Sequence, residues 1–541
     1  MRKRRTISMM TAAALGTGLI LQGTAFAASV PEGLLRTAIR YDITTMDVAK
    51  TTDDYLIPMN VFNRLFETKL IDNTAQVVPS ICTDYSVSGD GLTYDFTIQD
   101  GVVFSNGSAL TASDVQYTFE RLLKAGQKNM DIPEEVAGAD AVESGDADSL
   151  EGFRVTDDTH FSITLNKPNA GFTAELSAPA MSIVDKETME KVKNFGTDPA
   201  DTIGSGPYIV TEWEANDHYT LEYNPKYWGE EPTVRKVIVS VIPDANTQNL
   251  MFQDGELDMI DLQTLDNSIV ESTYKTMYGD QIVSTPKVGM TFLIFNENQE
   301  YLKDVNVRKA ISMSIDVDGI INSLYYGNAI REAGIIPTGI WAHNDAFKPL
   351  PYDPDGAKEL LKEAGYKDGD ISFELSVDSG ASDGNIKLVV QAISEMLKAV
   401  GIKASLKSYD HAAWLDLRSS GEMEAFVATW GMDYNDPANI MYTFFGSEKN
   451  TRQRSLNYTD KEVISRVAAA SAIVDDAERE KEYQALEQKI IGDDQAWCSM
   501  FAALHLYCIG DRVESFTPHW AGFSDFFATD VVLKTHSSSA D

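Results

Sequence analysis

The stretch from Ile371 to Leu406, ISFELSVDSGASDGNIKLVVQAISEMLKAVGIKASL, carries the clearest structural signal in this chain. Apolar and polar residues alternate over 371–377 and again over 402–406, which is typical of half-buried strands. Between these runs, the apolar residues of 386–400 recur at helical spacing, and Gly401 follows where the helix is expected to stop. A strand, a helix and a strand in so short a stretch predict a βαβ unit, and therefore an α/β lobe.

Similar signals continue on both sides of this unit. Thr111 with Asp114 three residues later predicts a helix start, and Asp353-Pro354 predicts another helix, which Gly365 ends. Residues 131–151 are acidic and rich in Gly and Ala, so we expect a surface excursion there. Further strands are expected at 94–98, 161–165 and 425–430, and further helices at 412–418, after a cap at 459–462, and over 475–491.

Residues 1–27 have the composition of a secretory signal peptide. A basic cluster at 2–5 precedes a mostly apolar run from Met9 to Leu21, and Ala25-Phe26-Ala27 matches a cleavage site. No cysteine near that site offers a lipid anchor, and no later run reaches the length of a membrane-spanning helix. We therefore expect an exported, soluble protein in the periplasm or another extracytoplasmic location.

The charge of the chain restricts its partners. Lys and Arg total 45 against 82 acidic residues, a formal net charge of −37, and such a surface repels nucleic acids and anionic lipids. Three cysteines are too few for a disulfide scaffold. Two possibilities stay open for Cys498 and Cys508: a disulfide bond between them, or two buried thiols.

Catalytic and metal-binding motifs are missing from the sequence. None of the patterns HExxH, GxxxxGK[ST], GxGxxG or GxSxG occurs, and the seven histidines are scattered. His505, Cys508 and Cys498 form only a loose grouping of potential ligands. We expect no metal, no cofactor and no enzyme activity, with a secreted hydrolase that uses an unrecognised carboxylate site as the alternative from another class.

Several segments, taken together, resemble family 5 of the extracellular solute-binding proteins, the dipeptide- and oligopeptide-binding proteins of ABC importers. They follow one another in family order over nearly the whole chain after residue 27. They are Tyr94–Val115 (YDFTIQDGVVFSNGSALTASDV), Gly204–Tyr208 (GSGPY), Asn224–Gly229 (NPKYWG), Ile242–Asn246 (IPDAN), Gly255–Asp258 (GELD), Asp304–Ala310 (DVNVRKA) with Ile315-Asp316, and Trp430–Pro437 (WGMDYNDP).

The resemblance implies an α/β, periplasmic-binding-protein type II-like fold with two lobes, an extra inserted domain and strand hinges. Domain I would be discontinuous and would combine 28–75, 200–295 and 505–541. Domain II would be the insertion 76–199, and domain III would be 296–504. Hinge bending would close the lobes over a ligand.

The resemblance also implies a ligand site. Asp433, three residues after Trp430, would pair with the α-ammonium group of a peptide; the alternative is that Asp433 caps a turn with Asn435, Asp436 and Pro437. Arg418 would contact the peptide carboxylate, or is a surface arginine. Trp430 and Trp414 would line the pocket, or pack in the core. Asp54, with its neighbours 52–53, would approach the peptide backbone.

The expected function is therefore that of an extracytoplasmic substrate-binding protein, a monomer that delivers di- or oligopeptides to the transmembrane subunits of an ABC permease. A non-peptide solute bound by the same fold is an open alternative: a nickel complex, an oligosaccharide, an opine or glutathione. A secreted chaperone-like or sensory binding protein is another. The sequence does not determine ligand length or side-chain preference.

Overall fold

The computed structural model describes residues 30–51, 55–72, 74–124, 127–379, 385–521 and 526–535. The predicted signal peptide and Asp54 lie outside these ranges. Within them, no helix combines the length and the apolar character needed to cross a membrane.

The predicted βαβ unit is confirmed. β15 (Ser372–Asp378) and β16 (Lys403–Tyr409) are parallel neighbours, and α12 (Ile386–Ala399) connects them. Gly401 ends the helix region with φ +86°, a left-handed conformation that costs glycine little. Leu406 departs from the expected alternation, because it is 37 % exposed on a strand at the edge of the sheet.

The unit belongs to an eight-stranded sheet in which β18, β13, β17, β15 and β16 lie side by side in that order. β13 is buried along its whole length, as expected for a central strand covered on both faces. β18 pairs with β13 and β14 through residues 497–503, and with β12 and β11 through residues 504–509. Besides β15 and β16, the sheet consists of β11 (Met259–Asp261), β12 (Ile282–Pro286), β13 (Gly289–Phe295), β14 (Ala329–Arg331), β17 (Ala425–Gly431) and β18 (Trp497–Ile509).

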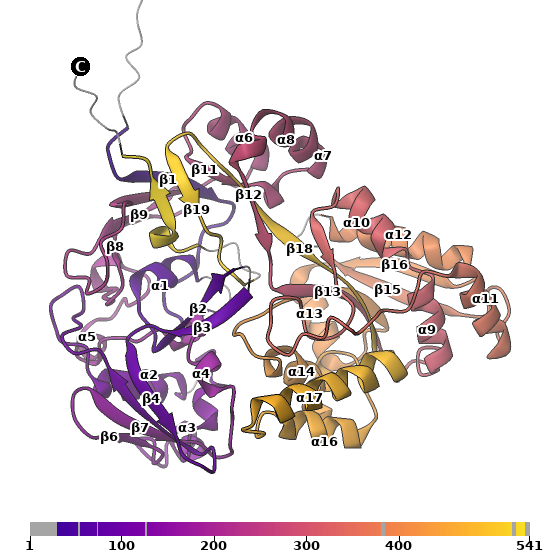
Figure 1. The fold of residues 1–541 in the computed structure, drawn as a ribbon, viewed down its shortest axis with the longest axis horizontal. Coiled ribbons are helices and arrows are strands. Elements are labelled where there is room, and N and C mark those ends of the chain that lie inside the picture. Colours follow the sequence, from indigo (N-terminus) through magenta and orange to yellow (C-terminus); the bar gives the residue numbers. More distant parts are fainter. Residues whose placement is uncertain are drawn as a thin grey trace, which may run out of the picture. The chain divides into compact units, whose positions relative to one another are not determined.

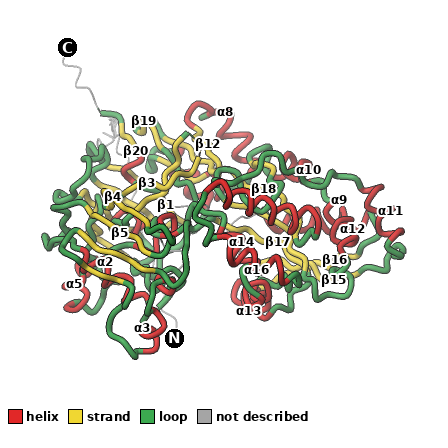
Figure 2. Tube along the Cα trace, turned by 60° about the horizontal axis from the view of Figure 1, so that its bottom comes forward, coloured by secondary structure: helices red, strands yellow, loops and turns green. Residues whose placement is uncertain are grey.

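Helices cover both faces of this sheet (Figures 1 and 2). Alternate residues of β13 point to opposite layers: Leu293 and Phe295 pack with one set of helices, and Phe292 and Ile294 with the other. The first layer holds α9 (Val305–Met313), α10 (Val317–Leu324), α11 (Pro354–Glu363) and α12; the second holds α13 (His411–Ser420), α14 (Ala438–Phe445), α16 (Lys461–Ala470) and α17 (Asp476–Glu487).

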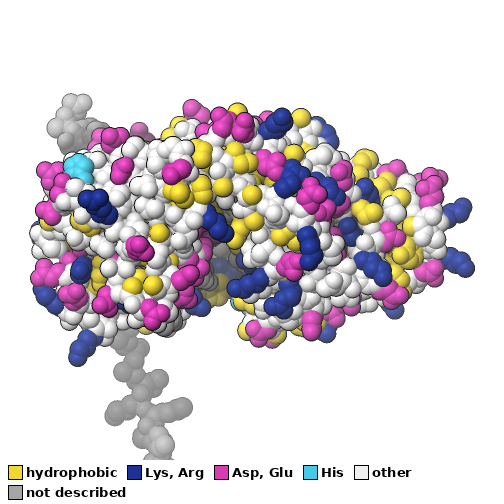
Figure 3. Space-filling view, turned by 90° about the horizontal axis from the view of Figure 1, so that it is seen from below, with side chains coloured by type: hydrophobic (Ala, Val, Ile, Leu, Met, Phe, Trp, Pro, Cys, Tyr) yellow, Lys and Arg dark blue, Asp and Glu magenta, His cyan; other side chains and the backbone are white. Residues whose placement is uncertain are grey.

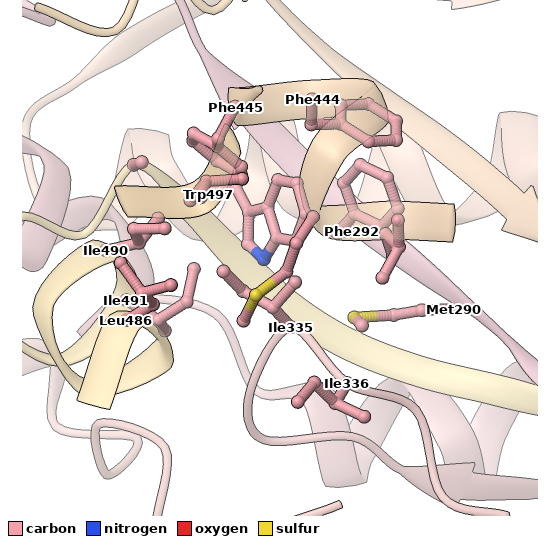
Figure 4. Close-up of a cluster of buried hydrophobic side chains, with 14 of the residues drawn as sticks. Met290, Phe292, Ile335, Ile336, Phe444, Phe445, Leu486, Ile490, Ile491 and Trp497 are labelled. Carbon is pink, nitrogen blue, oxygen red and sulfur yellow. The ribbon is translucent and has the colours of Figure 1, made fainter. Parts of the chain in front are cut away.

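Trp497 is the centre of the second layer (Figure 4). Its side chain is fully buried and stacks on Phe292 with ring centroids 4.3 Å apart. Phe444 and Phe445 of α14 contact the same ring at 5.4 and 5.3 Å. These contacts attach α14 to the sheet immediately after the loop that holds Asp433.

The first half of the chain forms two smaller sheets, one with the order β1-β10-β9-β8 and one with the order β4-β5-β7-β6. β2 pairs with β3 and β19 pairs with β20 as separate hairpins. The bounds are β1 (Leu34–Ile39), β2 (Phe66–Ile71), β3 (Thr74–Pro79), β4 (Cys82–Val87), β5 (Thr93–Ile98), β6 (Phe153–Val155), β7 (His160–Thr164), β8 (Tyr208–Glu214), β9 (His218–Tyr223), β10 (Lys236–Val241), β19 (Val513–Phe516) and β20 (Val531–Leu533).

The helices predicted after Thr111, after Asp353, at 412–418 and from 475 begin at or next to those residues, whereas most of the further helices of this paragraph were not predicted. The expected surface excursion at 131–151 is wrong, because Val136 and Leu150 are buried in the core around β5. The helix expected after 459–462 has Asp460 as its N-cap. The further helices are α1 (Leu56–Val61), α2 (Ala112–Leu122), α3 (Ala139–Ser144), α4 (Phe172–Glu175), α5 (Lys186–Lys191), α6 (Ala245–Gln253), α7 (Asn267–Ile269), α8 (Lys275–Met277) and α15 (Glu448–Gln453), with short 3-10 and π segments between some of them.

The open question about the cysteines is resolved. Cys82, Cys498 and Cys508 are all buried free thiols, and the last two lie near opposite ends of β18.

On the face drawn in Figure 3, acidic and basic side chains are interspersed rather than gathered into one patch.

Candidate functional site

The candidate site follows the carboxyl end of β17. At that end, Trp430 lies opposite Met290 and Gly431 lies opposite Gly289 of β13. A Cβ atom on Gly289 would lie 2.5 Å from the backbone oxygen of Trp430, so only glycine permits this close pairing. The chain then leaves the sheet, passes through Asp433 and enters α14, an arrangement that places side chains beyond the end of a strand.

Asn439, in the first turn of α14, fixes the position of Asp433. Its side-chain NH₂ group donates to Oδ2 of Asp433 at 3.2 Å. Its Oδ1 accepts from the indole N–H of Trp430 at 2.9 Å and from the backbone N–H of Asp433 at 3.4 Å. One buried amide therefore holds the tryptophan and the carboxylate in a defined relation.

Asp433 does not cap the following turn. That role belongs to Asp436, whose Oδ1 accepts from the backbone N–H of Ala438 at 2.8 Å. Asp433 is half-buried, and burial raises its pKa to about 6; repulsion from Asp131 adds to this, whereas Asn439 and Arg454 favour the ionised form. Asp433 is thus a carboxylate that lacks enough compensating positive charge.

Arg454 interacts electrostatically with this carboxylate, and Arg418 interacts in turn with Arg454. Arg454 places its guanidinium over the ring of Trp430, 5.0 Å from the centroid, and over Phe444 at 5.3 Å. Arg418 lies 5.0 Å above the ring of Trp414. Burial lowers the pKa of both groups, for Arg418 to about 10 with a further contribution from repulsion by Arg454.

Neither Arg418 nor Arg454 forms an ion pair of salt-bridge length within the described part of the chain, although Asp378 raises the pKa of Arg418 and Asp433 raises that of Arg454. The Nε of Arg418 is buried there without a hydrogen-bond acceptor. Partly buried cations without a close anion carry a desolvation cost, which an anionic group of a ligand would offset. The site therefore has one carboxylate suited to a cation and two guanidinium groups suited to an anion.

The other predicted site residues have different positions. Trp414 is 6 % exposed and packs edge-to-face on Phe426 at 5.5 Å, so most of its ring belongs to the core, with Arg418 on its outer face. Asp54 lies outside the described residues. Asn439, Arg454 and Asp131 were missed by the sequence reasoning, because none of them belongs to the quoted motifs.

The loop that holds Asp433 also contacts distant segments of the chain. The side-chain NH₂ of Asn435 donates to the backbone oxygen of Ala75 at 2.6 Å. Asp436 and Arg479 form an ion pair at 2.7 Å, with both side chains 2 % exposed. A Cβ atom on Gly171 would lie 3.0 Å from Cγ of Asp436, so the segment before α4 packs directly on this pair. Asp433 therefore lies where three distant parts of the sequence meet.

Comparisons with known proteins agree with this architecture. The family model of the bacterial extracellular solute-binding proteins, family 5 (middle part), matches residues 76–452. The probable D,D-dipeptide-binding periplasmic protein of Escherichia coli is 26% identical over 502 residues, which cover 90% of this chain and 92% of that protein. Heme-binding protein A of Haemophilus influenzae is 25% identical over 494 residues, which cover 87% of each chain.

Solved structures give the same result. The ABC transporter-associated periplasmic binding protein DppA of Helicobacter pylori, in complex with the peptide STSA, is 26% identical, has a TM-score of 0.73, and is matched over 93% of this chain and 98% of that one. This likeness confirms the expected two-lobed, type II-like α/β fold. The chain belongs to family 5 of the bacterial extracellular solute-binding proteins.

Proposed function

We propose that this chain is the extracytoplasmic receptor of an ABC importer and that it captures short peptides with both termini free. The observation that supports this most directly is the charge arrangement after β17. Asn439 holds the carboxylate of Asp433, which lacks enough compensating positive charge, and neither Arg418 nor Arg454 forms an ion pair of salt-bridge length among the described residues. This arrangement is complementary to a zwitterion.

Asp433 accepts the α-ammonium group of the peptide. A free α-amino group has a pKa near 8, so it is mostly cationic at neutral pH. When the ligand is enclosed, that cation requires an ionised partner, because an unpaired buried ammonium group is very costly. Asn439 and Trp430 pre-position the carboxylate, which lowers the entropy cost of binding.

Arg418 and Arg454 receive the peptide carboxylate. A guanidinium group presents paired N–H donors that match a carboxylate in a bidentate geometry. Their stacking on Trp414 and Trp430 restrains both side chains before the ligand arrives. The half-buried ring of Trp430 provides apolar contact area between the two charged ends.

The proposed division into domains is supported by the family and by the grouping of the strands into sheets. Domain II (76–199) contains the β4-β5-β7-β6 sheet. Domain I (28–75, 200–295 and 505–541) contains the β1-β10-β9-β8 sheet together with β11, β12 and β13 of the eight-stranded sheet, and domain III (296–504) contains most of the remaining strands of that sheet. The 504/505 boundary falls inside β18. The receptor is exported by the signal peptide, acts as a monomer in the periplasm and passes its ligand to permease subunits. It has no catalytic role.

Native mass spectrometry of freshly purified protein tests the ligand class, because a co-purified peptide would appear as added mass. Calorimetry then compares three forms of Ser-Thr-Ser-Ala: unmodified, N-acetylated and C-amidated. Acetylation removes the cation and amidation removes the anion, so each change should weaken binding by about 30-fold or more.

Equal affinity for the acetylated and the unmodified peptide would show that Asp433 does not bind the ammonium group of the peptide. A co-purified solute without an amino group would favour the non-peptide alternative, for which the Haemophilus heme-binding relative is a precedent. Cleavage of the peptide during incubation would indicate a hydrolase.

A further inference from the structure

A pocket lined by the loop of residues 346–350 lies apart from the Asp433 site. Its cavity volume is about 250 Å³, and much of its wall comes from this loop, the π segment Gln488–Asp493 and β18. None of the residues of the Asp433 site lines this pocket. It is therefore a separate concavity within the 296–504 part of the chain.

The lining of this pocket has a positive charge balance. Arg331 and Lys348 contribute to it, and no aspartate or glutamate of the described ranges does. This is unexpected in a chain with 82 acidic and 45 basic residues. A concave, partly desolvated site that is lined by positive charges attracts small anions.

Arg331 is held rigidly at the wall of the pocket. Its Nη1 donates to the backbone oxygens of Ser499 and Met500 at 2.9 and 2.6 Å, and also to that of Glu332. Its only ion pair among the described residues is with Asp318, at 4.0 Å, and the side chain of Asp318 is 79% exposed. The charge of Arg331 is thus fixed in place but poorly neutralised.

Ser312 supplies an independent indication of a ligand. The residue lies on α9, is 6 % exposed and lines the pocket. Its hydroxyl lies beside the thiol of Cys498 and meets no hydrogen-bond partner of good geometry within the described ranges. A thiol is only a weak partner for a buried hydroxyl, so an acceptor oxygen in the cavity would offset part of the cost of burying it. The neighbouring Cys498 is 4 % exposed, and burial raises the pKa of its thiol, so it adds no negative charge to the pocket.

We propose that this pocket binds a small organic monocarboxylate, with the carboxylate between Arg331 and Ser312. The aliphatic part of the ligand packs on Phe347 and Ile491, which are buried apolar residues of the wall. This apolar wall, opposite a single fixed guanidinium, favours a carboxylate with a short hydrocarbon chain over inorganic phosphate. The full chain therefore has an additional ligand site that does not depend on its peptide site.

The test uses butyrate as the probe, with acetate and inorganic phosphate at equal ionic strength for comparison. Calorimetry and saturation-transfer NMR on the full chain should show butyrate binding more tightly than acetate, and phosphate binding weakly or not at all. Ser312→Ala should weaken butyrate binding about tenfold, since it deletes a hydrogen bond to a charged group. Because the hydroxyl has only the weak Cys498 thiol as a neighbouring partner, this variant should fold normally.

Arg331→Gln, which retains donors for the backbone oxygens, should abolish butyrate binding. Both variants should keep the peptide affinity of the unchanged protein, and Asp433→Asn should keep its butyrate affinity, so the two proposals can fail separately. The inference is overturned if butyrate does not bind, if Ser312→Ala leaves its affinity unchanged, or if phosphate binds as tightly as butyrate.

Discussion

Replacing Asp433 by Asn changes the charge of the site and almost nothing of its shape. The amide that Asn introduces retains an oxygen that can accept from Asn439, which now donates to the carboxylate at 3.2 Å. The surrounding contacts to Trp430 do not involve the Asp433 side chain. Any change in affinity should therefore report on the lost charge.

Two effects of opposite sign follow from this substitution. The peptide loses its anionic partner, which costs about 2–5 kcal/mol, or a 30-fold to several-thousand-fold rise in Kd. The ligand-free protein becomes more stable, because burial raises the pKa of Asp433 from its ordinary value of 3.8 to about 6. Keeping that group ionised at pH 7.5 costs about 3 kcal/mol, and Asn removes this cost.

Calorimetry with unmodified Ser-Thr-Ser-Ala measures the first effect, and thermal unfolding of the ligand-free protein measures the second. The sign can be checked against pH: a carboxyl group with a raised folded pKa destabilises the protein above that pKa, so the gain in stability should disappear near pH 4. Asp416→Asn is the matched control, since Asp416 is an exposed carboxylate on α13. Unchanged affinity in Asp433→Asn, or an equal loss in both variants, would refute the assignment.

Three further outcomes are expected. Peptide affinity should be highest between about pH 6 and pH 8 and fall on both sides, because Asp433 must be ionised and the α-amino group protonated; a flat calorimetric profile would contradict this. Burial raises the pKa of Glu332 to about 8, and its side chain accepts from the backbone N–H of Thr338 at 3.1 Å. Glu332→Gln should therefore match the unchanged protein in unfolding free energy near pH 5 and exceed it by about 2 kcal/mol or more above pH 8. Equal denaturant midpoints of the two proteins at both pH values would contradict this. Trp497→Ala should cost about 3–5 kcal/mol in a denaturant titration, whereas Leu388→Ala, at a position 48 % exposed, should change little; similar losses would show that Trp497 is not central to the core.

Local signals in the sequence predicted much of the fold. The two strands, the helical spacing of 386–400 and the stop at Gly401 correspond to the observed unit, with exposed Leu406 as the exception to the alternation. These features depend on neighbouring residues, which a single sequence contains. The mistaken surface excursion at 131–151 shows the limit, because its acidic composition concealed the buried Val136 and Leu150.

The candidate site was only partly predictable. Asp433, Trp430 and Arg418 could be proposed from the family motif and its spacing. Arg454 could not, because its relation to Trp430 arises from the packing of α14 and α15 rather than from any local pattern. The unpartnered state of the arginines also depends on what surrounds them in space, which the sequence does not state.

β18 changes partners part of the way along its length, from β14 at Ala503 to β12 at Leu504. A strand anchored on both sides of such a point resists sliding, since a one-residue slip would turn every buried side chain to the opposite face. Twisting or bending of the strand leaves its pairing register unchanged and therefore meets far less resistance. Rearrangement around this strand should thus be a rotation about the junction of residues 503 and 504, with both groups of neighbours carried along as rigid bodies.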